Sequence, residues 1–177
     1  MRSDDSIRDA ILEEALVAIP FDGWTDHVVS AAAEKIGVGS VVAGRLFKNG
    51  AASLVEHYSN QADNTMLEFL ESQNLDELGV RQRISIAVKF RLKQNESNRE
   101  AIRAALSFLL LPRNSLMSAR CLYRTVDSIW FGVGDKSTDF NFYTKRSLLA
   151  AAYTATLLYW LDDQSYESQD TWAFLTR

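Results

Sequence analysis

The chain has 177 residues, a net charge of −4 and a hydrophobic content of 47%, values that fit one globular domain of ordinary size and exclude wholesale disorder. It holds only 2 Pro and 8 Gly, fewer than a sheet protein with many tight turns needs, so we expect an all-α fold. A single cysteine, Cys121, excludes an internal disulfide. No apolar stretch reaches the ~20 residues of a membrane-spanning helix, and the first residues resemble neither a signal peptide nor a transit peptide. We therefore expect a soluble, intracellular protein.

Charge is unevenly distributed along the sequence. Residues 81–124 contain ten bases against two acids, whereas residues 59–80 contain five acids and no base. This basic centre could meet anionic lipid head groups or an acidic protein surface. Equally, its bases could lie on solvated helix faces and pair with the neighbouring acidic segments.

Three short helices are predicted in the first third of the chain, over residues 7–19, 25–36 and 40–47. Asp4 or Asp5 is the expected cap of the first helix, and Pro20 is expected to end it. Thr25 is the expected cap of the second, and Gly37 is placed in the turn before the third.

Helical periodicity continues through six later segments, over residues 51–70, 80–92, 97–111, 115–131, 143–161 and 169–176. Ser97 and Glu100 have the spacing of a capping box at the start of one of them. A polar loop over 134–139 separates the two longest segments of the second half.

The three short helices predict a helix-turn-helix over residues 1–58, followed by a helical domain over 59–177. The order of Gly23-Trp24, Ala31-Ala32-Ala33 and Gly37-Val38 resembles the N-terminal domain of TetR-type regulators. That resemblance implies a helical ligand-binding domain that dimerises through its last two long helices. The third helix offers only Arg45 and Ser40 to a nucleic acid, and the net charge repels phosphate, so we expect no nucleic-acid binding.

A second resemblance covers nearly the whole chain. The run from Gly134 to Tyr153, which contains Ser-Thr-Asp-Phe-Asn-Phe-Tyr-Thr-Lys-Arg, is similar to the signature of the ubiquinone (coenzyme Q) biosynthesis accessory lipid-binding family of mitochondria and alphaproteobacteria. Phe21-Asp-Gly-Trp24, Leu110-Leu-Pro-Arg-Asn114 and Val126-Asp-Ser-Ile-Trp130 also fall in the expected order.

The second resemblance implies a homodimeric TetR-like fold that has lost DNA binding and that binds isoprenoid quinones or other long-chain lipids. It also implies a partner, the di-iron hydroxylase that acts on demethoxyubiquinone. The implied partner surface comprises Asp127, Ile129, Phe142, Tyr143 and Arg146, where Phe142 replaces the tryptophan of better-known members.

Exposed Phe, Tyr and Arg side chains have the composition of an interaction hot spot, although aromatic residues at a helix start also serve ordinary packing. On this view, Arg146→Glu is expected to abolish partner binding and leave the fold intact.

A hydrophobic stripe along the later helices is a candidate lipid pocket. Its predicted lining consists of Phe108, Leu111, Met117, Leu122, Trp130, Tyr153, Leu157, Trp160 and Leu161. Such a stripe serves equally as solid core. The alanines 150–152 and Ala155 suit either a dimer seam or internal packing.

Cellular placement also follows from the second resemblance. Eukaryotic members begin with an arginine-rich transit peptide that is absent here, so we expect a bacterial cytoplasmic protein at the periphery of the inner membrane. Members also extend past the point that matches Leu175 with an amphipathic membrane-binding helix. Since this chain ends at Arg177, we expect either a truncated form or a weakened membrane contact.

No catalytic or metal-binding constellation stands out in the sequence. His27 and His57 lack the Glu-x-x-His spacing of a di-iron bundle, and no Gly-x-Ser-x-Gly nucleophile motif occurs. We therefore expect a non-enzymatic protein without a cofactor of its own, which binds an isoprenoid quinone and presents it to the hydroxylase. The alternative is a TetR-type ligand-responsive transcriptional regulator.

Overall fold

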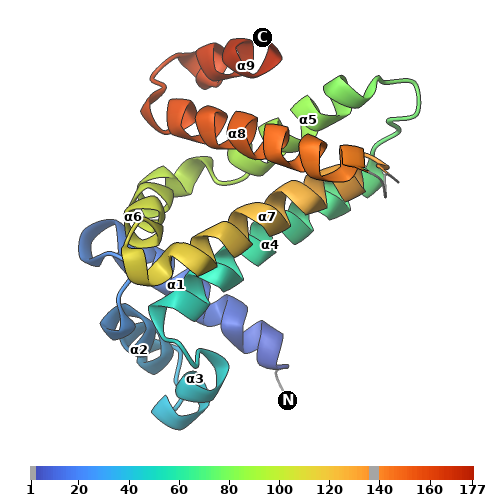
Figure 1. Ribbon diagram of the computed structural model, residues 1–177. Coiled ribbons are helices and arrows are strands. Elements are labelled where there is room, and N and C mark those ends of the chain that lie inside the picture. The colour runs from blue at the N-terminus through green and yellow to red at the C-terminus, as the bar shows by residue number, and fades with distance from the viewer. Residues whose placement is uncertain (1–2, 136–139) are drawn as a thin grey trace. The chain divides into compact units, whose positions relative to one another are not determined.

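The computed structural model describes residues 3–135 and 140–177, and every regular element within them is a helix (Figure 1). The all-α class is therefore confirmed. The chain divides into two compact units, Met1–Asn60 with Asn98–Ala119, and Gln61–Ser97 with Arg120–Arg177. The first break lies close to the predicted boundary at 58, but the segment 98–119, which was expected in the second domain, groups with the first sixty residues.

The first unit is built around the helix α1. Its helices are α1 (Asp4–Asp22), α2 (Asp26–Lys35), α3 (Ser40–Leu46), α6 (Arg99–Leu109) and the beginnings of α4 (Ala51–Ser72) and α7 (Ser115–Gly132). Residues spaced at helical intervals on α1, among them Ile11, Ala15 and Ile19, are fully buried in its core. Trp24 follows α1 and donates its indole N–H to the Ala101 carbonyl at 2.9 Å, which fixes α6 against this core.

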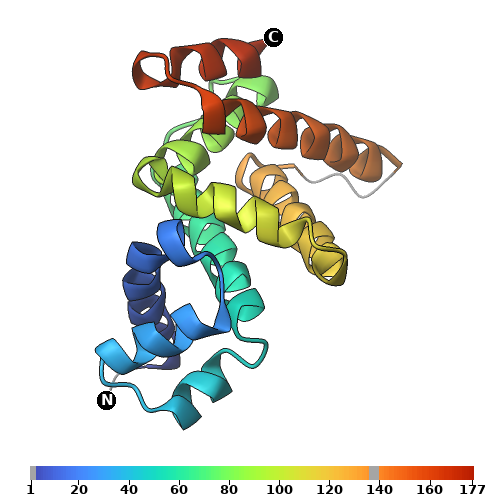
Figure 2. The same cartoon turned by 90° about the vertical axis from the view of Figure 1, so that its left-hand side faces the viewer.

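The helix-turn-helix forms as predicted. Thr25 caps α2 by accepting a hydrogen bond from the Val28 N–H at 3.3 Å. Gly37 adopts a φ of +75° in the turn before α3, a backbone conformation that side chains disfavour. In Figure 2, the blue α1 and α2 lie side by side, and α3 follows them in cyan.

Three local predictions about helix ends were wrong. The cap of α1 is Ser3 rather than Asp4 or Asp5, because the Ser3 hydroxyl accepts from the Ser6 N–H. Pro20 lies inside α1, which continues to Asp22 and is closed by Gly23. The Ser97–Glu100 capping box is absent, since a short 3₁₀ turn (Glu96–Asn98) precedes α6.

The second unit contains the remaining helices. These are α5 (Val80–Lys93), α8 (Phe140–Asp162), α9 (Gln169–Thr176) and the later parts of α4 and α7. The Phe69 and Phe90 rings stack at 3.9 Å between centroids, and Trp160 on α8 is fully buried. Gly132 allows α7 to approach α4 closely, because a Cβ there would lie 2.6 Å from a methyl carbon of Leu70.

A carboxylate organises the entry to α9. Asp163 accepts hydrogen bonds from the backbone N–H groups of Ser165 and Thr171, at 2.8 and 2.9 Å, and from the Thr171 hydroxyl. Desolvation acts to raise the pKa of Asp163, but these hydrogen bonds outweigh it and hold that pKa well below its usual range. Asp163 therefore satisfies N–H groups before and within the first turn of α9, as a capping side chain does.

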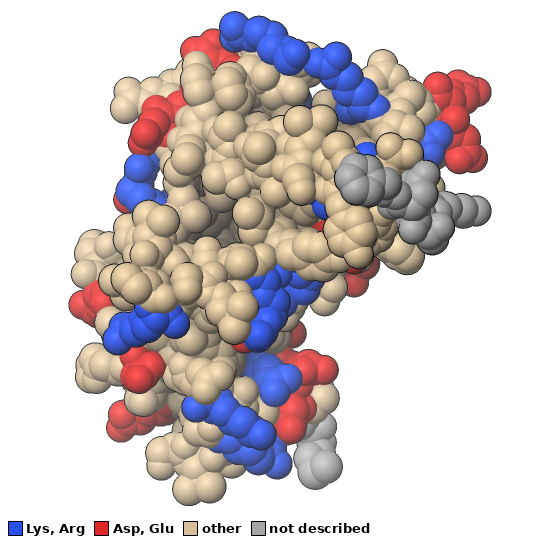
Figure 3. All heavy atoms as spheres, in the orientation of Figure 1, with Lys and Arg blue, Asp and Glu red and all other residues tan. Residues whose placement is uncertain are grey.

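Surface charge is mixed on the face that Figure 3 draws. Lysine and arginine side chains lie near acidic ones there, and uncharged residues cover most of the area. Within the described ranges, no helix combines the length and the apolar character needed to cross a membrane.

Candidate functional site

The start of α8 carries an aromatic pair from the predicted partner surface. The Tyr143 side chain is 70% exposed, and its ring meets the half-buried Phe142 ring edge-on at 5.2 Å between centroids. The Arg146 guanidinium lies 3.4 Å from the centre of the Phe142 ring, in a cation–π contact. Arg146 thus fixes the ring of Phe142 and leaves Tyr143 facing outward.

Arg146 itself is buried, so the expectation of an exposed arginine in this cluster was wrong. Its guanidinium contacts Asp127 at 2.7 Å and Asp135 at 3.6 Å, and only 8% of the residue is exposed. Buried charged groups in proteins are generally paired, because a buried charge without a counter-charge is strongly destabilising. The role of Arg146 visible in the structure is therefore to tie α8 to α7 and to the residues that follow α7.

The two other members of the predicted partner surface differ in exposure. Asp127 is 44% exposed at its side chain and remains accessible while it pairs with Arg146. Ile129 is 0% exposed and belongs to the core. Next to them, Lys145 pairs with Asp135 at 2.9 Å and lies over the Trp130 ring. The structure therefore brings Asp127, Phe142, Tyr143 and Arg146 together, with Ile129 packed beneath the surface.

The nine predicted lipid-lining residues are divided between the two units. Phe108 and Met117 pack against the core of the first unit, and Leu111 is 40% exposed there. In the second unit Leu122 is half-buried, and the other five are buried: Trp130, Tyr153, Leu157, Trp160 and Leu161. The lipid pocket stays a prediction.

A buried polar network in the second unit was missed by the sequence analysis. Asp63 on α4 binds the Arg91 guanidinium of α5 at 2.7 Å and accepts from the Thr125 hydroxyl of α7 at 3.1 Å. Arg91 also donates to the Tyr153 hydroxyl of α8 and to Thr125. Burial raises the pKa of the Tyr153 phenol above its ordinary value, with opposition from the nearby Arg91 charge.

This network gives the predicted lining a polar side. The Tyr153 hydroxyl accepts a hydrogen bond from Arg91, and the Arg91 guanidinium also lies 5.4 Å from the centre of the Tyr153 ring, so Tyr153 borders the charged pair with both its ring and its hydroxyl. The sequence signal that could have found the network is weak. Asp63 and Arg91 fall on positions where a helical pattern predicts the buried face of their helices.

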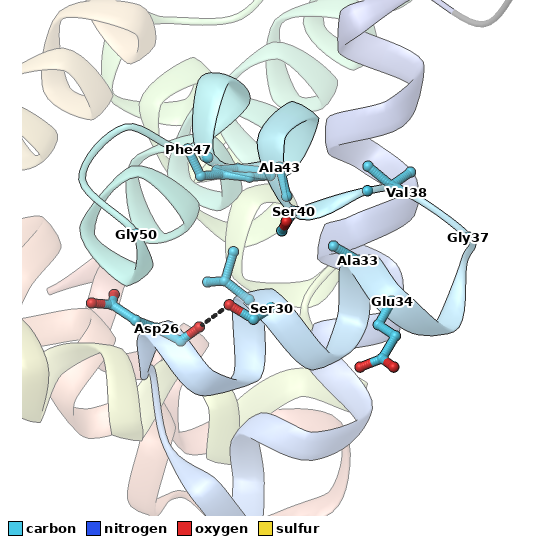
Figure 4. Close-up of a pocket in the computed structure, with 13 residues that line it drawn as sticks. Asp26, Ser30, Ala33, Glu34, Gly37, Val38, Ser40, Ala43, Phe47 and Gly50 are labelled. Atoms are coloured by element: carbon cyan, nitrogen blue, oxygen red, sulfur yellow. Dashed lines mark hydrogen bonds between the residues drawn. The ribbon is translucent and has the colours of Figure 1, made fainter.

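The first unit carries an open groove of about 650 Å³ between α2 and α3. As Figure 4 shows, Asp26, Ser30 and Glu34 approach it from α2, and Ala43 and Phe47 approach it from the other side. Its lining includes two carboxylates and no lysine or arginine, and none of the nine predicted lipid-lining residues. A surface with this charge repels a phosphate backbone.

Potential metal ligands do not gather into a site within residues 3–135 and 140–177. No group of three or more His, Cys, Asp or Glu side chains there is arranged to hold a metal ion. Cys121 is buried, and its sulfur lies 3.8 Å from an Arg124 nitrogen.

The sequence is similar to named proteins along nearly its whole length. The family model described as COQ9 matches residues 116–177, the part that contains the aromatic cluster and α9. The human protein named ubiquinone biosynthesis protein COQ9, mitochondrial, is 36% identical over 98% of this chain, and the corresponding protein of Xenopus tropicalis is 35% identical over the same share. The chain spans 56% of the length of each of these relatives.

A solved structure shows the same fold. The TetR transcriptional regulator from Nitrosomonas europaea aligns with a TM-score of 0.77 over 96% of this chain and 94% of that one, at 22% identity. At this identity the similarity concerns the fold alone, and it confirms the TetR-like architecture. With the sequence matches along nearly its whole length, the chain belongs to the COQ9 family of ubiquinone biosynthesis proteins.

Proposed function

We propose that this protein is a non-enzymatic accessory protein of ubiquinone biosynthesis, which binds isoprenoid quinone intermediates and presents them to the di-iron demethoxyubiquinone hydroxylase. The observation that carries the proposal is the match to named ubiquinone biosynthesis proteins over 98% of the chain. In this proposal the protein acts as a homodimer at the periphery of a membrane, in the cytoplasm if the chain is bacterial.

Lipid binding is supported by the buried apolar side chains of the second unit, among them Trp130, Leu157 and Trp160. Removing a long isoprenoid tail from a bilayer costs free energy. Burial of the tail in the protein offsets that cost by about 0.8 kcal/mol per CH₂ group. The buried pair of Arg91 and Tyr153 supplies hydrogen-bonding groups of the kind that a quinone ring with carbonyl and hydroxyl oxygens needs. The proposal therefore places the head group toward Tyr153 and the tail among the leucine and tryptophan side chains.

Docking of the hydroxylase is assigned to the aromatic pair at the start of α8. Tyr143 is highly exposed, and its ring packs edge-on against Phe142. Phe142 is in turn fixed by its cation–π contact with Arg146. Rigid aromatic side chains of this kind dominate the binding free energy of many interfaces. Asp127, at the same surface, adds a partly exposed charge.

The test is co-purification of the hydroxylase with Tyr143→Ser. Truncating a hot-spot tyrosine costs about 2 kcal/mol or more, so we expect the amount of hydroxylase retained to fall at least tenfold. Tyr166→Ser is the matched control, because Tyr166 is a second exposed tyrosine of the same unit, 77% accessible. Equal retention by the wild type and Tyr143→Ser would contradict the docking assignment.

Gene regulation is a second candidate, favoured by the likeness to the Nitrosomonas europaea regulator. Two features oppose it. Arg45, the basic residue of α3, is paired with Asp4 at 2.9 Å, and the lining of the groove beside α3 includes two carboxylates and no lysine or arginine. A mobility-shift assay on genomic fragments at increasing salt decides between the two, because DNA binding through phosphates weakens steeply as salt rises.

A further inference from the structure

Three leucines are exposed at the turn that joins α6 to α7 in the first unit. Leu110 is 82% exposed, Leu111 40% and Leu116 72%, and Pro112 and Arg113 between them are exposed as well. We call residues 110–116 the leucine turn. In Figure 2 it is the bend where the yellow-green α6 gives way to the yellow α7.

The leucine turn is held in a defined shape. Asn114 is buried and donates its side-chain N–H to the Phe108 carbonyl at 2.7 Å, while its backbone N–H donates to the Leu111 carbonyl at 2.8 Å. Pro112 restricts the backbone at the start of the short 3₁₀ turn Pro112–Asn114. An ordered backbone therefore holds the leucines in solvent. Hydration of these apolar side chains is unfavourable, and contact with an apolar phase would remove that free-energy cost.

The charge around the leucine turn is positive. Residues 101–119 include Arg103, which pairs with Glu100 at 3.6 Å, and Arg113 within the leucine turn itself, and they contain no acid. Elsewhere in the first unit, Phe21, 87% exposed, precedes Asp22, and Val17, 66% exposed, lies one turn from Glu13, whereas Val41, 85% exposed, is a single residue on α3 one turn from Arg45. Leucines beside an unopposed arginine fit an anionic lipid surface, where aliphatic side chains enter the acyl boundary and the guanidinium stays among the head groups.

We propose that the leucine turn is a membrane-contact site, which inserts Leu110, Leu111 and Leu116 into the interface of an anionic bilayer with Arg113 at the phosphate level. A bilayer suits this surface better than a protein partner does, because leucine is under-represented among the hot-spot residues of protein interfaces. This inference rests on the proposed membrane-peripheral function and names the surface that makes the contact. It is tested separately from the rest of that function, since binding to vesicles requires neither a quinone nor the hydroxylase.

The test is sedimentation of the full chain with phosphatidylcholine vesicles that contain a minority of phosphatidylglycerol. Leu110→Ser combined with Leu116→Ser is expected to lower the vesicle partition coefficient at least tenfold, because two apolar side chains are removed from the interface. Phe21→Ser is the matched control for loss of an exposed apolar residue, and it is expected to leave partition unchanged. Thermal unfolding of each variant checks that the fold is retained.

The electrostatic part is tested with Arg113→Glu. One basic side chain near an anionic surface changes partition about fivefold (about 1 kcal/mol), so a reversal of charge is expected to lower partition about 20-fold at low salt and less at high salt. Lys48→Glu is the matched control, since Lys48 is an exposed base of the same unit away from the leucine turn. Vesicles of phosphatidylcholine alone are expected to bind the wild type more weakly.

A second readout locates the inserted residues. A polarity-sensitive fluorophore on Leu116→Cys, in a Cys121→Ser background, is expected to shift its emission to the blue when anionic vesicles are added. The proposal is overturned if the wild type does not bind these vesicles, if the leucine variants bind like the wild type, or if the fluorophore stays in water while the protein is bound. A change of oligomeric state in the double variant with unchanged vesicle binding also overturns it, in favour of a protein contact.

Discussion

Removal of the Arg91 guanidinium is expected to cost a large part of the stability of the second unit. Asp63 is 3% exposed at its side chain, and its carboxylate contacts Arg91 at 2.7 Å, so Arg91→Met leaves a buried negative charge without its main counter-charge. Breaking one side of a buried pair typically costs about 3–5 kcal/mol, against a total stability of about 5–15 kcal/mol for a domain. The Tyr153 hydroxyl loses a hydrogen-bond donor in the same variant.

Removing both charges should be far less harmful. In the double variant Asp63→Asn with Arg91→Met, the amide oxygen still accepts from Thr125, and the deeply buried charge pair is removed as a whole. Arg124, which lies 3.7 Å from Asp63, is 29% exposed at its side chain and so keeps contact with water. We expect the double variant to recover at least ~2 kcal/mol of the loss in Arg91→Met. In a chain of this length, the loss in the single variant corresponds to a fall in Tm of roughly 10 °C.

The assay is a double-mutant cycle by urea and thermal unfolding, followed by far-UV circular dichroism. A positive coupling free energy between the two sites, with Arg91→Met the least stable member, is the expected result. The reasoning is refuted if Arg91→Met loses less than about 1 kcal/mol, or if the double variant is less stable than the sum of the two single effects implies.

Three further predictions follow from single positions. Gly50→Ala is expected to lower the free energy of unfolding in urea by about 2–3 kcal/mol, because the φ of Gly50 is +54° and the added Cβ meets the Asp26 carboxylate that caps α4. Gly44→Ala, with open space around it, is expected to raise that free energy by about 1 kcal/mol. The lowered pKa of Asp163 means that its contribution to stability is present above the unfolded value of about 3.9 and is lost as pH falls below it; pH titration of unfolding should show a smaller acid loss in Asp163→Asn than in the wild type. Arg146→Glu is expected to lower Tm, because it puts a third carboxylate beside two others, so a selective loss of partner binding with unchanged Tm would contradict a buried, structural role for Arg146.

Local sequence patterns were enough to predict the helices of this fold. Apolar spacing located α1 to α3 because each buries one face against a nearby helix, and Thr25 and Gly37 carry capping and turn chemistry that acts within a few residues. Pro20 was misjudged because α1 continues past it for two residues, to Asp22, before Gly23 closes the helix, although a proline at that position removes one backbone hydrogen bond.

The buried network could not be predicted in the same way. Asp63 and Thr125 are 62 residues apart, and the network that they share with Arg91 and Tyr153 depends on how four helices pack rather than on any local pattern. Arg146 shows the same limit. Its position in the family signature suggested an exposed docking residue, whereas its pairing with Asp127 and Asp135 is a tertiary contact that buries it.

The central claim is that this protein carries an isoprenoid quinone, and the most direct test is mass spectrometry of the organic extract of the purified chain, with a delipidated sample as control. We predict that ubiquinone intermediates or other long-chain isoprenoids co-purify in the untreated sample and are absent after delipidation. An extract free of isoprenoid lipids, from protein that still unfolds cooperatively, would contradict the claim.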